Sequence, residues 1–318
     1  MRPILQTLTT GYMLMFFSEN LFWARYRPGE DSLINYVLTW FAYSLIAYVL
    51  LALVRRFRVR SLPAIFLVGA TCGWLAEGII VQTAYEQFPL QLSWTGLAWH
   101  ALITVVWGWY FLRKTLVRGT LIQVMLNFGL LGLFYGFWAI FWRVEAPTSP
   151  TFPGEFAWFA FTITLLYGMC VWLFQRLSDP PFNPGKRIFV VVVGLFALIF
   201  LVAVVPAIPW ALAVLPPLLA LVWWGLSQNR RIETRPDVLE ELTDPVPSAN
   251  LLGLLAMPIS AILIYTLADL LDLRLLTNWV VYLITTPVGA IAFITSLALI
   301  WHRNRMHRSA GKVISLAE

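Results

Sequence analysis

Glu77 and His100 are the residue pair in this sequence best suited to acid–base chemistry. They lie in the stretch 73–100, GWLAEGIIVQTAYEQFPLQLSWTGLAWH, where most other side chains are apolar or aromatic. A carboxylate and an imidazole that share a partly dry pocket can exchange a proton with each other and with a bound molecule. The sequence therefore predicts Glu77 and His100 as a catalytic acid and base. A hydrogen bond that only joins two helices is the alternative interpretation.

A second group of residues has the chemistry to assist that pair. Glu19, within Ser18-Glu19-Asn20, is predicted as an auxiliary catalytic carboxylate, although a shallow acid that reaches water has the same pattern. The predicted substrate-binding residues are polar or aromatic: Asn20, Tyr85, Glu86, Trp99, Trp138 and Arg143. Tyr85 and Glu86 are expected in the outer loop, Asn20 and Arg143 at the same level, and Trp99 and Trp138 deeper in the membrane. Arginine suits an anionic head group, and tryptophan suits an apolar or cationic ligand. Interfacial anchoring and bulk packing remain open for these side chains.

Several other chemistries have no support in the sequence. There is no H-E-x-x-H, Walker A, G-x-S-x-G or G-x-G-x-x-G signature. The two cysteines, Cys72 and Cys170, fall inside apolar stretches, which is typical of buried thiols. Of the three histidines, His302 and His307 lie in the basic C-terminal tail. The sequence therefore predicts no metal site and no cofactor.

The composition is that of a membrane protein. Hydrophobic residues make up 60% of the 318 residues and charged residues only 12%, against about 25% charged in soluble domains. Apolar runs of about 20 residues are long enough to cross a bilayer. The net charge of +6 comes from basic clusters beside these runs, which indicates membrane orientation rather than nucleic-acid binding.

Ten membrane-spanning helices are predicted, because the backbone in lipid must satisfy its own hydrogen bonds and no alternating barrel pattern occurs. Their ranges are 4–24, 33–54, 62–83, 94–112, 120–142, 156–175, 187–207, 209–226, 251–271 and 279–301. The loops alternate in charge, with 18 of the 22 Lys and Arg on one side of the membrane. By the positive-inside rule both termini are cytoplasmic. The expected location is a bacterial or archaeal cytoplasmic membrane.

Within these helices the polar residues share one level and glycines share faces with them. At 1.5 Å per residue, Glu19 and Glu77 lie about 22 Å from the cytoplasmic ends of their helices, and His100 lies about 9 Å below the outer surface. Gly69 and Gly73 precede Glu77 at four-residue intervals, so all three share a helix face. Gly96 precedes His100 in the same way. Glycines 129, 132 and 136 repeat the pattern on the fifth predicted span.

We therefore expect an all-helical polytopic membrane protein formed by one transmembrane domain, 1–318, with a polar, aromatic-lined cavity that opens to the extracytoplasmic side. Predicted spans one to five, 1–155, carry the polar site, and 156–318 form a more apolar scaffold. The scaffold includes a cytoplasmic loop, 227–250, in which residues 236–243 are predicted to form a short acidic helix.

Three functions fit this pattern. The first is a membrane-embedded enzyme that acts on a lipid or isoprenoid-like substrate. The second is a transporter of a small cationic or amphipathic solute, which the ten-span count favours. The third is an accessory subunit of a membrane complex, in which the acids only connect helices. Membrane lipids are the expected partners in each case.

Overall fold

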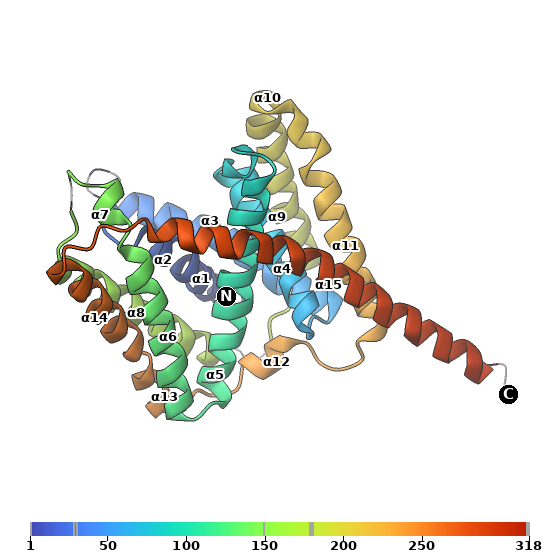
Figure 1. Cartoon of the computed structure of the whole chain (residues 1–318). Coiled ribbons are helices and arrows are strands. Elements are labelled where there is room, and N and C mark those ends of the chain that lie inside the picture. Colours follow the sequence, from blue (N-terminus) through green and yellow to red (C-terminus); the bar gives the residue numbers. More distant parts are fainter. Residues whose placement is uncertain (1, 28, 30, 149, 178–180, 316–318) are drawn as a thin grey trace. The chain divides into compact units, whose positions relative to one another are not determined.

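The computed structural model describes residues 2–27, 29, 31–148, 150–177 and 181–315. Every regular element in these ranges is a helix (Figure 1). The predicted all-helical class is therefore confirmed.

Eight helices in the described ranges are long and apolar enough to cross a membrane. They are Leu33–Phe57, Leu62–Ile80, Leu121–Glu145, Pro153–Arg176, Lys186–Ala207, Pro209–Ile232, Ser248–Leu270 and Thr277–His307. Each coincides with one of the ten predicted spans. The other two predicted spans, 4–24 and 94–112, are also helical but are not among the eight. These two carry Glu19 and His100 amid Thr, Ser, Trp and Tyr residues.

The helices pack into two compact units, and all but one of the boundaries between them fall within helices. Unit 1 comprises residues 1–45, 107–182 and 241–284, and unit 2 comprises residues 46–106, 183–240 and 285–318. Each unit combines segments from 1–155 with segments from 156–318, so the two units do not coincide with the two parts predicted from the sequence. A single transmembrane domain stays a prediction.

Unit 1 is built from short and long helices drawn from three parts of the chain. Its complete elements are α1 (Arg2–Met15), η1 (Phe16–Asn20), α2 (Leu21–Trp23), α5 (Arg113–Arg118), α6 (Leu121–Ala139), α7 (Trp142–Glu145), α8 (Pro153–Arg176), α13 (Ser248–Gly253) and α14 (Ala256–Leu270). It also contains the start of α3 (Leu33–Phe57), the end of η4 (Leu92–Leu112) and the start of α15 (Thr277–Ser315).

The packing of α6 against α14 in unit 1 depends on glycine. A Cβ atom at Gly136 would lie 2.5 Å from the carbonyl oxygen of Ala261, and one at Gly132 would overlap the carbonyl oxygen of Met257. Gly129, one turn away, is different, because its added Cβ would lie 3.5 Å from Ser260 Oγ. Two of the three glycines predicted to share this face are therefore points of backbone contact.

Unit 2 contains the middle of the chain and its two proline-rich helices. Its complete elements are α4 (Leu62–Leu75), η2 (Ala76–Ile80), η3 (Thr83–Tyr85), α9 (Lys186–Ile199), η5 (Phe200–Val204), α10 (Val205–Ala207), η6 (Pro209–Ala213) and α11 (Leu215–Ile232). The remaining parts of α3, η4 and α15 complete it. Figure 1 shows the chain turning at α10, so 186–207 and 209–232 are separate helices, as predicted.

The loop 227–250, which the sequence predicts to be cytoplasmic, contains the expected short helix, α12 (Val238–Leu242). Within unit 2 its N-terminal end is attached to α3 and to the residues that follow it. Arg55 Nη1 lies 2.9 Å from Asp237 Oδ2, and the backbone N–H of Val238 donates to the carbonyl of Val59. Asp237 also accepts a hydrogen bond from the Leu239 N–H, which satisfies a donor at the helix start.

The α6–α14 contact gives a matched pair of variants. Gly132→Ala should lower the free energy of unfolding by about 1–3 kcal/mol, because a methyl group cannot fit against the Met257 carbonyl. Gly129→Ala should leave stability nearly unchanged, since its Cβ has room. Thermal unfolding of both variants in one detergent tests this, and equal stability of the two would contradict the packing.

Candidate acid–base site

Glu77 and His100 form a buried hydrogen-bonded pair in unit 2. His100 Nε2 lies 2.8 Å from Glu77 Oε1. The Glu77 side chain is 11% exposed and the His100 side chain 5% exposed. The two residues that the sequence singled out as acid and base are therefore in contact, with the carboxylate as the more accessible member.

A wide helical turn and a reversal of the chain position Glu77. It lies on η2, a π-helical turn in which the Val81 N–H reaches back five residues to the carbonyl of Ala76. Gln82 then adopts a left-handed conformation, with φ of +70°, and ends the helix. The chain folds back at this point, so that the Thr83 hydroxyl donates to Glu77 Oε2. Both carboxylate oxygens consequently have a hydrogen-bond partner.

Close helix packing at two glycines places His100 beside the Glu77 carboxylate. An added Cβ at Gly73 would overlap the Gly96 carbonyl oxygen and lie 2.8 Å from His100 Cβ. The space beside Gly96 is filled by the Trp74 ring, whose Nε1–H donates to the Leu92 carbonyl at 3.2 Å. The shared faces predicted for Gly73 with Glu77 and for Gly96 with His100 thus meet each other.

The loop after Glu77 carries two of the predicted substrate-binding residues. Tyr85 is buried, and its hydroxyl donates to the Gly78 carbonyl at 2.9 Å, which ties the loop to η2. Burial raises the pKa of Tyr85 to about 12, so its phenol is a neutral donor at physiological pH. Glu86 is exposed. Trp99 is buried next to His100 in the chain, and its ring packs against that of Trp94.

Glu19 and Asn20 belong to unit 1. Glu19 accepts hydrogen bonds from Trp23 Nε1 and from the Tyr43 hydroxyl, each at 2.9 Å. Asn20 Nδ2 lies 3.3 Å from the Tyr36 hydroxyl. Glu19 and Asn20 line the same pocket, which has a volume of about 340 Å³.

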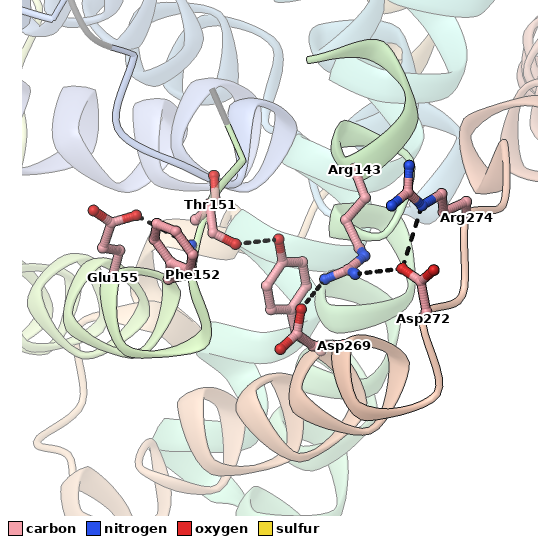
Figure 2. Close-up of polar contacts among 8 residues, drawn as sticks. Arg143, Thr151, Phe152, Glu155, Asp269, Asp272 and Arg274 are labelled. Carbon is pink, nitrogen blue, oxygen red and sulfur yellow. Dashed lines mark hydrogen bonds and ion pairs between the residues drawn. The ribbon is translucent and has the colours of Figure 1, made fainter. Parts of the chain in front are cut away.

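Arg143 also belongs to unit 1, where acidic residues surround its guanidinium. Figure 2 shows it directed at Asp269 and Asp272, with ion pairs to both, and Asp272 also pairs with Arg274 at 3.2 Å. Its predicted role at an anionic head group stays a prediction, and two carboxylates already contact its terminal nitrogens.

Trp138, the last predicted substrate-binding residue, is buried in unit 1. Its Nε1–H donates to the Phe22 carbonyl at 2.6 Å.

The structure thus joins some of the predicted site residues and assigns others to a different unit. Glu77, His100, Tyr85, Glu86 and Trp99 belong to unit 2. Sequence reasoning missed Thr83 and Tyr43, since hydroxyls in apolar sequence carry no signal of their partners. Within the described part of the chain, no cluster of three or more His, Cys, Asp or Glu side chains is placed to hold a metal.

Comparison of the chain with protein-family models, curated proteins and solved structures finds no match. The fold itself defines the class. Eight long apolar helices make this chain a polytopic, all-helical integral membrane protein. Within that class, its distinguishing feature is a hydrogen-bonded Glu–His pair on adjoining apolar helices.

A double-mutant cycle tests the pair. Glu77→Gln and His100→Gln should each lower the free energy of unfolding by about 1–3 kcal/mol, because each leaves a buried polar partner poorly satisfied. The double variant should lower the free energy of unfolding by less than the sum of the two single variants, since it removes both partners at once.

The control cycle combines His100→Gln with Glu86→Gln, which changes an exposed acid in the nearby loop. The effects of these two substitutions on the free energy of unfolding should be additive. Additive effects in the Glu77–His100 cycle as well would show that the two side chains are not coupled.

Proposed function

We propose that the protein is a membrane-embedded enzyme that acts on a lipid or isoprenoid-like substrate through Glu77 and His100. The observation that carries this proposal is the 2.8 Å contact between a carboxylate and an imidazole, both buried in apolar helices. Ionisable residues within membrane helices are costly to insert, by about 2.5–3.5 kcal/mol at the helix centre, and they commonly mark functional sites.

The exposure of the two side chains suggests their order of action. Glu77 is more exposed than His100, so its carboxylate is the group that contacts substrate. His100 lies behind it and exchanges the proton through Nε2 and Oε1. Thr83 holds the second carboxylate oxygen and so fixes the plane of the acid.

The local backbone supports a functional role. Glu77 lies on η2, a π-helical segment of five residues. Such single-turn segments are rare and occur frequently at functional sites.

The substrate class follows from the surroundings and from the expected depth. The level predicted for Glu77 and His100, about 9 Å below the outer surface, lies in the outer third of the hydrocarbon core, beneath the lipid head groups. A reactive group close to that level, surrounded by apolar helices, suits an amphipathic substrate that diffuses within the bilayer. This proposal retains ten spans with cytoplasmic termini in a bacterial or archaeal cytoplasmic membrane, and it rests on Glu77 and His100 alone. A shared site with Glu19, Asn20, Trp138 and Arg143 stays a prediction.

Turnover of native lipids tests the proposal. Wild-type protein, Glu77→Gln, His100→Gln and, as a control at an exposed acid outside the predicted site, Glu240→Gln are reconstituted into liposomes made from a total bacterial lipid extract, and mass spectrometry follows the lipid composition. Wild type and Glu240→Gln should deplete one lipid and form a product. Both site variants should be slower by about a hundredfold or more, as expected for loss of a general acid or base.

Two results would contradict the enzyme. If wild type leaves the lipids unchanged but accumulates a cationic solute in a Glu77-dependent manner, the protein is a transporter. If Glu77→Gln impairs only folding or assembly, with no change of lipid or solute by wild type, the pair connects η2 and η4 and the protein is an accessory subunit.

A further inference from the structure

A polar pocket in unit 1 has the features of a second ligand site. It has a volume of about 340 Å³ and lies between the η1–α2 segment, the chain that follows it and the start of α3. The left-handed residue Ala24, with φ of +56°, ends α2 and turns the chain around the pocket. Glu19, Asn20 and Tyr36 contribute polar atoms to its lining.

The charge of Glu19 is the feature that selects a ligand. Its carboxylate accepts hydrogen bonds from the Trp23 indole and the Tyr43 hydroxyl, both neutral donors. Among the residues that the structure describes, no cation forms an ion pair with it. A carboxylate that lines a pocket beside apolar sequence and lacks an ionic partner favours a bound cation.

The basic residues that line the same pocket are not ionic partners of Glu19. Arg27 pairs with Asp31 at 2.7 Å and stacks on Trp23, with its guanidinium carbon 3.9 Å from the ring centroid. Arg25 is buried, with its guanidinium carbon 5.4 Å from the centroid of the Trp142 ring. Arg25 lines the pocket as a second charged group, and the choice of a cationic head group rests on the Glu19 carboxylate.

A larger apolar groove adjoins the polar pocket. It has a volume of about 610 Å³, runs along the first turns of α8, and shares Tyr26 and Phe159 with the polar pocket. Trp158, which is 77% exposed, lines the groove, and Gly154 leaves open space there. A polar pocket that continues into an apolar groove matches a molecule with a charged head and a hydrocarbon chain.

We propose that unit 1 binds a phospholipid whose head group carries an ammonium, as in phosphatidylethanolamine. The ammonium contacts Glu19 in the polar pocket, which Tyr26 and Tyr36 also line, and an acyl chain occupies the groove along α8. This site is separate from the Glu77–His100 pair and does not depend on the enzymatic proposal.

Native mass spectrometry of the delipidated full chain in neutral detergent tests the site. The protein is titrated with phosphatidylethanolamine, with N-acetyl-phosphatidylethanolamine of the same chains, and with free ethanolamine. Wild type should bind the first at least about tenfold more tightly than the second, since acetylation removes the charge-assisted hydrogen bond. Free ethanolamine should bind far more weakly than the lipid, because it has no chain for the groove.

Two variants address the two halves of the site. Glu19→Gln keeps the size of the side chain and should weaken phosphatidylethanolamine binding by about tenfold. Gly154→Leu adds a side chain to the lining of the groove at a position where a Cβ meets no atom within 4 Å, and it should weaken binding of both lipids alike. Glu77→Gln and Glu86→Gln should bind as wild type does, which separates this test from that of the enzyme.

Equal affinity for the two lipids, or unchanged binding by Glu19→Gln, would overturn the ammonium site. Binding of free ethanolamine as tight as that of the lipid, or unchanged binding by Gly154→Leu, would overturn the role of the groove.

Discussion

The close contact between α4 and η4 at Gly73 is the constraint on which the acid–base pair depends. Since neither Gly73 nor Gly96 has a side chain, the two helices approach until backbone meets backbone. In lipid, where helices gain little from the hydrophobic effect, small residues permit the van der Waals contact that holds them together. A larger residue at Gly73 would push His100 away from the carboxylate, because His100 Cβ lies where the new atoms would be placed.

Glu19 and Glu77 are placed in the apolar chain by the same kind of local backbone structure. Each lies on a π-helical turn, and in each case a left-handed residue ends the helix five positions later, at Ala24 and Gln82. The chain that follows supplies or supports hydrogen-bond donors, so that the carboxylate is satisfied. The two acids differ in their partners. Glu77 contacts an imidazole that can carry charge, whereas the donors to Glu19 in the described part of the chain are neutral. These partners underlie the two functions proposed for the two acids.

Part of this arrangement could be predicted from the sequence because bilayer length, glycine spacing and basic loops are local signals. They indicated the eight long helices, the turn between 207 and 209 and the shared faces of Gly73 and Gly96. The contacts of Arg143 with Asp269 and Asp272 could not be found in this way. More than a hundred residues separate the arginine from the two acids, and each acid alone indicates only the end of a helix. The rotation of each helix about its own axis could not be predicted from the sequence either. A π-helical turn adds a residue and rotates every later side chain, so four-residue spacing no longer shows which residues face each other.

The central claim is that Glu77 is a reactive group open to the extracytoplasmic side, and thiol accessibility tests it most directly. Cys72 and Cys170 are both buried and are replaced by alanine to give a background without cysteine. Glu77→Cys and, as a control in the exposed loop, Glu86→Cys are then treated in intact cells with a membrane-impermeant maleimide. The account predicts that both cysteines are labelled from outside. Labelling at position 86 but not at position 77 would contradict it, because Glu77 and His100 would then form a sealed contact between helices.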